Sequence, residues 1–141
     1  MGGLAAAHKR GAESYAQELT LKLAAEKKLP IPKHSFSEST IIKCGSISIE
    51  AYFPGAGHAL DNIVAWLPEQ KILFAGCITK SIHARGLGFT KDGDLKTWPS
   101  SLKKVLNRYP DAKLVFPGHG SAGSLDLLRH TIGLLKKSGY E

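Results

Sequence analysis

The sequence predicts an α/β sandwich, for three reasons. The chain has the length of one ordinary domain, 141 residues, and neither an internal repeat nor a shift in composition divides it. Segments with strand-like and helix-like patterns alternate along it, which is typical of sheets that pack against helices. Residues that commonly bind metals directly follow strand-like segments, and loops in such places often carry functional sites.

Four helices are predicted from apolar residues at helical spacing and from the glycines and prolines that end helices. Pro99 fits the first turn of the third helix, where a proline is tolerated. Ser124 is expected to cap the last helix and Gly139 to close it. The predicted helices span residues 3–9, 18–28, 95 or 98 to 109, and the segment between Ser124 and Gly139.

Five strands are predicted between and after these helices. In one of them Ile47, Ile49 and Ala51 alternate with polar residues and Tyr52, which predicts a strand with one buried face. The polar segment 34–38 is interpreted as a surface loop. The loop at 76–93 is long for a compact domain, and long loops tend to be functional. The predicted strands span residues 39–44, 46–53, 62–67, 71–75 and 113–116.

Composition excludes several classes of protein. Hydrophobic residues make up 43% of the chain and charged residues 22%, which are values of globular proteins. No apolar run approaches the roughly 18 to 20 residues of a membrane-spanning helix, so no membrane partner is expected. The net charge of +7 comes from scattered residues and not from a basic stripe with interleaved aromatics, so nucleic acid is not expected either. No signal peptide is recognised at the start, which leaves export open.

The two cysteines lie in different contexts and permit at most one disulfide. Cys44 ends a strand-like segment and is interpreted as a structural thiol. Cys77 follows a strand-like segment in a loop, where a thiolate can act as a ligand. The redox compartment stays open.

Three residues are candidate ligands of a zinc ion: His58, Cys77 and His119. Each lies in a glycine-containing turn next to a strand-like segment, and zinc prefers imidazole and thiolate ligands. Their wide spacing excludes a compact zinc finger and suits a site assembled from separate loops. Taken singly, each is more often not a ligand, so the prediction depends on all three converging. The tryptophans Trp66 and Trp98 are interpreted as core or interface residues.

The order of these motifs resembles the subclass B1 metallo-β-lactamases along nearly the whole chain. The turns that carry the three candidate ligands match in their order and in their flanking residues. The matching motifs are Gly55-Ala56-Gly57-His58 with Asp61-Asn62, Trp66-Leu67-Pro68, Gly76-Cys77 with Lys80, Trp98-Pro99, Pro117-Gly118-His119-Gly120 and His130-Thr131.

This resemblance implies an αββα sandwich, of which residues 1–141 would be a single partial domain, the C-terminal portion. It implies zinc-dependent hydrolysis of β-lactam antibiotics in the periplasm. His58 would bind the first zinc ion, and Cys77 and His119 would bind the second. Lys80 would pair with the carboxylate of the substrate.

The departures from the family pattern are informative. Phe89 stands in the substrate-binding loop where many members have an asparagine, and a phenylalanine cannot donate a hydrogen bond to a developing oxyanion. The family's His-x-His-x-Asp motif, which supplies further zinc ligands, is absent from the chain. Asp61, Asp92 and Asp94 are not expected to replace it, because the first belongs to the His58 turn and the others precede a helix.

We therefore expect a C-terminal fragment that is inactive alone and needs the N-terminal half as a partner. Two alternatives stay open. A vestigial or non-catalytic zinc-binding protein of the same fold would also lack ligands. Another metallo-hydrolase of the superfamily, such as a thioester hydrolase, is disfavoured by Cys77, because those relatives generally use a carboxylate at the second site.

Overall fold

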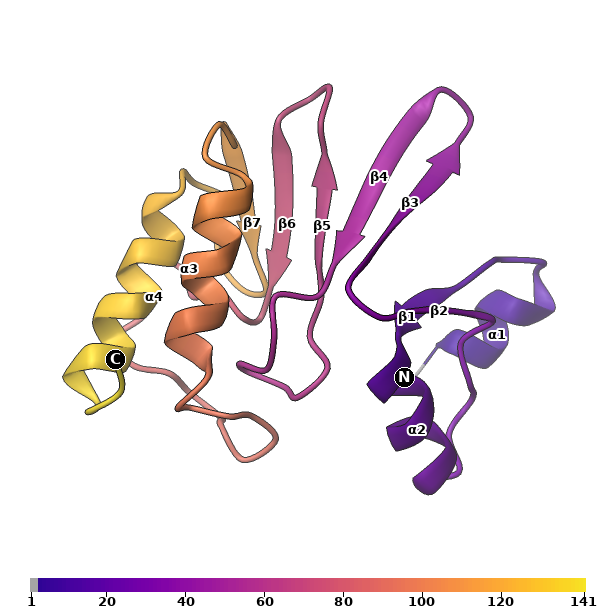
Figure 1. Cartoon of the computed structure of the whole chain (residues 1–141), viewed down its shortest axis with the longest axis horizontal. Coiled ribbons are helices and arrows are strands. Elements are labelled where there is room, and N and C mark those ends of the chain that lie inside the picture. The colour runs from indigo at the N-terminus through magenta and orange to yellow at the C-terminus, as the bar shows by residue number, and fades with distance from the viewer. Residues whose placement is uncertain (1–2) are drawn as a thin grey trace.

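The computed structural model describes residues 3–141 and contains two sheets (Figure 1). The larger sheet has five strands in the order β3-β4-β5-β6-β7, and the smaller one pairs β1 with β2. The strands are β1 (Tyr15–Gln17), β2 (His34–Phe36), β3 (Ser39–Cys44), β4 (Ile47–Tyr52), β5 (Val64–Leu67), β6 (Ile72–Gly76) and β7 (Leu114–Pro117). The helices are α1 (Leu4–Lys9), α2 (Glu18–Glu26), α3 (Trp98–Arg108) and α4 (Asp126–Lys137).

The direction of the strands decides which loops meet. Strands β3 to β6 pair antiparallel in chain order, and β7 then pairs parallel to β6 after the crossover through α3. Because β4, β6 and β7 consequently run in the same direction, their carboxyl ends lie at the same edge of the sheet. The loops that follow these three strands therefore lie near one another.

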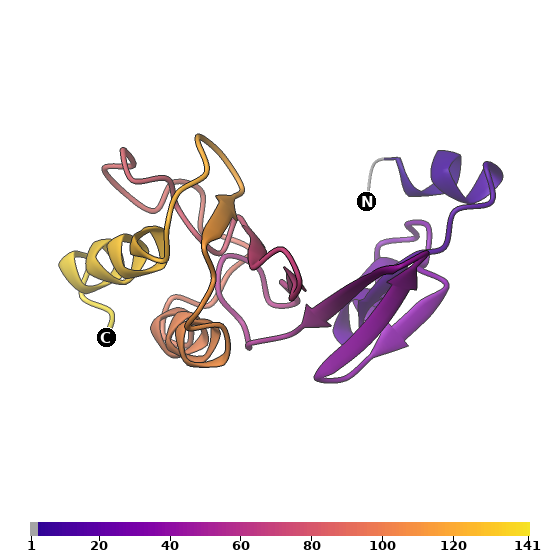
Figure 2. The same cartoon turned by 90° about the horizontal axis from the view of Figure 1, so that it is seen from above.

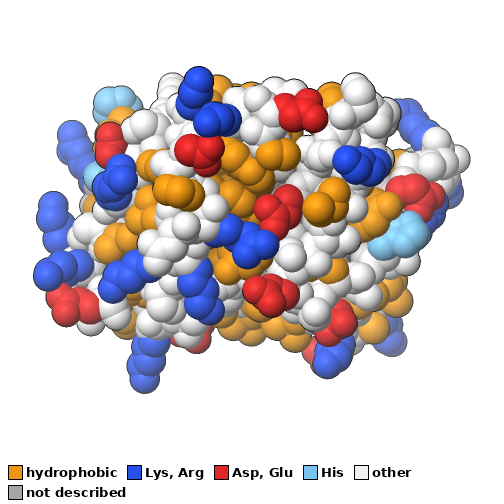
Figure 3. Space-filling model, turned by 45° about the horizontal axis from the view of Figure 1, so that its top comes forward, with side chains coloured by type: hydrophobic (Ala, Val, Ile, Leu, Met, Phe, Trp, Pro, Cys, Tyr) orange, Lys and Arg blue, Asp and Glu red, His pale blue; other side chains and the backbone are white. Residues whose placement is uncertain are grey.

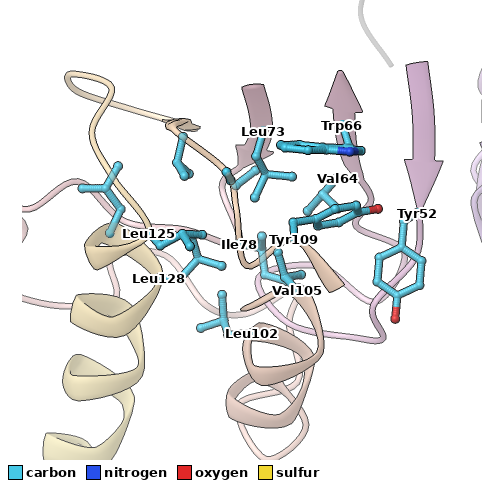
Figure 4. Packing of buried hydrophobic residues seen from close by; sticks show 14 of the residues in the cluster. Tyr52, Val64, Trp66, Leu73, Ile78, Leu102, Val105, Tyr109, Leu125 and Leu128 are labelled. Carbon is cyan, nitrogen blue, oxygen red and sulfur yellow. The ribbon is translucent and has the colours of Figure 1, made fainter. Parts of the chain in front are cut away.

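Helices α3 and α4 cover one face of the five-stranded sheet. Their apolar stripes include Leu102, Val105 and Leu128, each fully buried against the sheet residues Leu73 and Val115. Figure 4 shows side chains from β4 to β6 and from both helices pointing toward one another across this layer. Burial of these large side chains from water is the main stabilising force of the fold.

The opposite face of the sheet is also apolar. Directly paired residues on this face include Ala51 on β4, Ala65 on β5, Phe74 on β6 and Phe116 on β7, and none of them is charged. Phe74 remains 44% exposed, and its ring stacks on that of Phe116 with 4.8 Å between centroids. Figure 3 shows that hydrophobic side chains also reach the surface across the middle of the molecule, between charged side chains.

The N-terminal elements form a separate group beside the sheet. Figure 2 shows α1, α2, β1 and β2 at one side, away from α3 and α4. The Thr20 hydroxyl on α2 donates a hydrogen bond to the Asp61 carboxylate at 2.7 Å, which ties this group to the His58 turn. Among the helices of residues 3–141, none is long and apolar enough to cross a membrane.

One sequence expectation was wrong, and another holds only in part. Segment 34–38 is not simply a loop, because His34–Phe36 forms β2, pairs with β1 and buries Phe36. On β4 the predicted face buries Ala51 but leaves Ile47 39% exposed, and Tyr52 of the other face is buried on the side of the helices. The alternating pattern identified the strand, but Tyr52 packs its ring against Tyr109 of the α3 end, and this contact decides which face meets the helices.

Candidate metal centre

The three predicted ligands lie in loops at one edge of the large sheet. His58 follows β4, Cys77 directly follows β6, and His119 follows β7. These strands end at the same edge, so the parallel β6–β7 pairing and the intervening antiparallel strands bring the three turns together. The structure thus places all three predicted ligands in separate loops at this edge.

The Cys77 and His119 turns touch through their backbones. The Gly118 N–H donates a hydrogen bond to the Gly76 carbonyl at 2.8 Å. A Cβ atom at Gly118 would lie 2.3 Å from the Cys77 sulfur and 2.7 Å from its nitrogen, so no larger residue fits there. Glycine at this position therefore allows the approach of the two candidate ligand turns.

The His58 turn is held by polar side chains beneath it. The Asn62 side chain accepts a hydrogen bond from the Ala59 N–H at 3.0 Å and donates one to the Gly55 carbonyl at 2.9 Å. The buried Ser101 hydroxyl on α3 donates to the Ala56 carbonyl at 2.6 Å. These bonds satisfy backbone groups that the turn leaves unpaired, so the turn is fixed on α3.

A positively charged side chain lies beside His58. The Lys80 Nζ is 3.5 Å from the His58 Nδ1. Burial lowers the pKa of His58, and the neighbouring charges of Lys80 and His119 lower it further, against the opposing effect of Asp92. Burial also lowers the pKa of Lys80, although nearby Cys77 acts in the opposite direction. These effects indicate that the five side chains share one electrostatic environment.

Lys80 is fixed from two sides. Its backbone N–H donates to the Thr131 hydroxyl on α4 at 2.8 Å, and that hydroxyl, fully buried, donates in turn to the Leu127 carbonyl. Its ammonium group lies 5.3 Å from the centre of the Trp98 ring. The position of Lys80 is therefore set by both helices that cover the sheet.

The predicted site residues differ in exposure. His58, Cys77 and Lys80 are half-buried, whereas His119 is exposed, and Phe89 is 59% exposed in the long loop. Within residues 3–141, no group of three or more His, Cys, Asp and Glu side chains is arranged so that it could hold a metal ion. Imidazole and thiolate donors suit zinc, but the donors present do not form a sufficient set. Binding of zinc by His58, Cys77 and His119 stays a prediction.

Two of the three aspartates at this edge, Asp61 and Asp94, have other partners. Asp61 accepts the hydrogen bond from Thr20. Asp94 precedes α3 and accepts hydrogen bonds from the Thr97 hydroxyl and the Thr97 N–H, and these bonds lower the pKa of its carboxyl group. Asp92 lies in the exposed part of the same loop and makes no such capping bond in the described chain.

The remaining thiol and histidine residues lie outside this group. Cys44 is exposed at the end of β3, and both cysteines are free thiols. His130 on α4 contacts the Ala84 carbonyl at 2.9 Å through Nε2. His83 is exposed.

Solved structures identify the class of protein to which this arrangement corresponds. A metallo-β-lactamase from Pontibacter korlensis superimposes with a TM-score of 0.92 and 45% identity, over 96% of this chain and 63% of that one. VMB-1 superimposes with a TM-score of 0.90 and 42% identity, over 98% of this chain and 63% of its own. The described chain thus has the fold of part of a metallo-β-lactamase, and the predicted fold class is confirmed.

Curated relatives define the resemblance further. The chain is 43% identical over 131 residues to the metallo-β-lactamase type 2 of Bacteroides fragilis and 39% identical over 136 residues to that of Bacillus cereus. It spans about half the length of these relatives, 53% in each case, and matches their C-terminal part. No family model matches the sequence. The predicted resemblance to this part of subclass B1 metallo-β-lactamases is confirmed.

The sequence did not reveal the helix residues whose side chains bond to the loops of the site. Ser101 and Thr131 carry no pattern of their own beyond lying on amphipathic helices, and both prove to be buried hydroxyls that bond to site loops. The only indication of Thr131 in the sequence was the motif His130-Thr131, which belongs to the family resemblance. Trp98 was predicted as a core or interface residue and is fully buried, but its contacts with His58 and Lys80 were not foreseen.

Proposed function

We propose that this chain takes part in zinc-dependent hydrolysis of the β-lactam amide bond. The observation that carries the proposal is the meeting of the His58, Cys77 and His119 turns with Lys80 at one sheet edge. The relatives that the chain matches are named as metallo-β-lactamases, and they share this part of the fold. Residues 1–141 would form one partial domain of such an enzyme.

The chain's residues would hold zinc only together with ligands from outside them. His58 would bind one ion, and Cys77 with His119 would bind a second. A catalytic zinc ion commonly has three protein ligands and one open position, so each ion lacks ligands in this chain. We therefore propose that the isolated chain is inactive and that ligands supplied by further polypeptide complete the site.

Zinc, when bound, supplies a Lewis acid that activates water and stabilises the negative charge that develops as an amide bond breaks. The protein's own residues would bind and orient the substrate. The half-buried ammonium group of Lys80 would pair with the substrate carboxylate, because burial strengthens such a contact. The exposed ring of Phe89 would offer apolar contact to the substrate without hydrogen bonding to the reacting carbonyl.

The cellular role proposed is resistance to β-lactam antibiotics in the periplasm. This compartment is what the resemblance to the family implies.

One observation favours a second candidate, a non-catalytic zinc-binding protein of the same fold. The described residues contain no group of three or more donors placed to hold a metal ion. Such a protein would bind zinc weakly through two donors and hydrolyse no substrate. The thioester hydrolase alternative is weaker, because Cys77 lies where a hydrolase of that kind would use a carboxylate.

Complementation of the chain tests the proposal. The purified chain is assayed with zinc and a chromogenic cephalosporin, alone and after refolding with an N-terminal segment of a related metallo-β-lactamase that carries the His-x-His-x-Asp motif. We expect no turnover from the chain alone and turnover from the mixture. Cys77→Ser should abolish that turnover, whereas Cys44→Ser, the matched control, should retain it.

Each outcome separates the candidates. Turnover by the chain alone would contradict the proposal that its ligand set is insufficient. A mixture that binds zinc but hydrolyses nothing would favour the non-catalytic candidate. Equal loss of turnover in both cysteine variants would show that Cys77 has no special role.

A further inference from the structure

Trp98 is a core residue whose ring also contacts the candidate site. It is fully buried in the first turn of α3. The ring centroid lies 5.6 Å from that of His58 at an interplanar angle of 62°, an edge-to-face arrangement. The Lys80 ammonium lies 5.3 Å from the ring centroid. One aromatic ring therefore contacts both a predicted zinc ligand and the predicted substrate-binding lysine.

The polar edge of the same ring fixes the Cys77 loop. The Trp98 Nε1–H donates a buried hydrogen bond to the Ile78 carbonyl at 2.8 Å. Ile78 is the residue next to Cys77 and is itself almost fully buried. Because a buried indole N–H without a partner is costly, this bond favours one position of the backbone at residue 78.

The other tryptophan has no such contacts. Trp66 is also buried, at 8% exposure, but its ring packs against Tyr109, 5.1 Å away between centroids, at the middle of the sheet. The two tryptophans thus share their residue type and their core cluster. Of the two tryptophans, only Trp98 also contacts residues at the edge that carries the candidate ligands.

We propose that Trp98 is a positioning residue for the candidate site. It holds the Lys80 ammonium against its ring beside His58 and, through Ile78, fixes the turn that presents Cys77. Thr131 holds the backbone of Lys80 from the α4 side, so Trp98 determines the direction of the Lys80 side chain and not the place of its backbone. The catalytic consequence rests on the proposed function, whereas the positioning itself does not.

The variants Trp98→Phe and Trp98→Leu separate the two contacts of the ring. Phenylalanine keeps an aromatic face for Lys80 but removes the N–H donor to Ile78, and leucine removes both. Trp66→Phe and Trp66→Leu are matched controls, since they make the same changes in the same core. Nuclear magnetic resonance of the full chain, without zinc, follows the Lys80 side-chain methylene signals and the His58 ring signals.

We expect the Lys80 methylene signals of the unmodified chain to be shifted upfield by the indole ring. That shift should shrink in Trp98→Phe and disappear in Trp98→Leu, and the His58 ring signals should move in both variants. The Trp66 variants should leave the Lys80 and His58 signals unchanged, even where they lower the free energy of unfolding equally. Unchanged Lys80 and His58 signals in both Trp98 variants would overturn the proposal and leave Trp98 a packing residue only.

A second measurement covers the case in which the Trp98 variants do not fold. Lys80→Met removes the ammonium group that lies over the Trp98 ring, and we expect this substitution to shift the Trp98 indole N–H signal. The control is Lys104→Met. Lys104 is exposed in the middle of α3, the helix that also carries Trp98, and its substitution should leave the indole signal in place. An equal response to both substitutions would contradict the proposed contact.

The consequence for turnover is tested separately in the complemented enzyme. There Trp98→Leu should raise KM for the β-lactam more than Trp98→Phe does, because leucine removes the aromatic face that holds the substrate-binding lysine and phenylalanine keeps it. A complemented enzyme without activity would refute the proposed function while leaving the resonance result intact. The two proposals can therefore fail independently.

Discussion

Substitution of Gly118 by alanine tests the packing that brings the Cys77 and His119 turns together. The added Cβ atom would lie 2.3 Å from the Cys77 sulfur, 2.7 Å from its backbone nitrogen and 2.8 Å from its Cα. Two of these neighbours are backbone atoms, which cannot rotate away as a side chain can. The two turns must therefore move apart, and overpacking of this kind typically costs about 1 to 3 kcal/mol of unfolding free energy.

Gly133 provides a matched control on α4. An added Cβ atom there meets nothing within 4 Å, so alanine introduces no clash. Alanine is also favoured over glycine inside a helix by roughly 0.5 to 1 kcal/mol. The same substitution should consequently destabilise the chain at residue 118 and stabilise it at residue 133.

Urea unfolding followed by circular dichroism measures both changes. A second readout is the rate at which an aromatic disulfide reagent modifies Cys77, in a Cys44→Ser background that removes the other thiol. We expect Gly118→Ala to accelerate this modification and Gly133→Ala to leave it unchanged. A Gly118→Ala chain with unchanged stability and unchanged Cys77 reactivity would refute the close approach of the two turns.

Three further predictions follow from contacts around the site. Thr131→Val should lower the unfolding free energy by about 1 to 3 kcal/mol, because it removes the buried hydroxyl to which the Lys80 N–H donates, whereas Thr131→Ser should retain most of the stability. Urea unfolding measures both variants, and equal stability of the valine variant would contradict the role of the hydroxyl. Hydrogen bonds from Thr97 lower the folded-state pKa of Asp94, so its stabilising contribution should be present above its unfolded pKa of about 3.9 and be lost as the pH falls through the folded pKa. Thermal unfolding from pH 6 to pH 2 should show a shallower acid loss in Asp94→Asn, and identical profiles would refute this. Phe74→Lys should reduce binding of the dye ANS with little change in stability, because Phe74 is 44% exposed on an uncharged sheet face. The control is Lys71→Ala, which removes an ion pair with Asp111 three residues earlier in the chain.

The sequence was sufficient for the elements with strong periodicity. Helix α3 was predicted within a residue or two of its bounds from Leu102, Val105 and Tyr109, and the central strands were found from their apolar runs. The turns that carry His58, Cys77 and His119 were located because glycine marks sharp turns beside strands. Their convergence was predicted from their common place next to strand-like segments, and the resemblance added the fold in which they would lie at one edge.

Other features depend on contacts between residues far apart in the sequence. The pairing of Tyr15–Gln17 with His34–Phe36 was missed, because strands of three residues have too few positions to show a period of two. The burial of Tyr52 instead of Ile47 is decided by α3, which lies far along the chain. The contacts of Trp98 with Lys80 and His58 likewise arise from tertiary packing, so a tryptophan in an amphipathic helix gave no sign of them.

The most direct test of the central claim is the cobalt spectrum of the complemented site. Co²⁺ bound by a thiolate gives a charge-transfer absorption band that imidazole and carboxylate ligands do not give. If Cys77 completes a metal centre with His58 and His119 nearby, the band should appear in the Cys44→Ser chain after complementation and be absent from Cys77→Ser. A band that survives in Cys77→Ser, or no band in any complemented chain, would contradict the claim that this sheet edge holds metal.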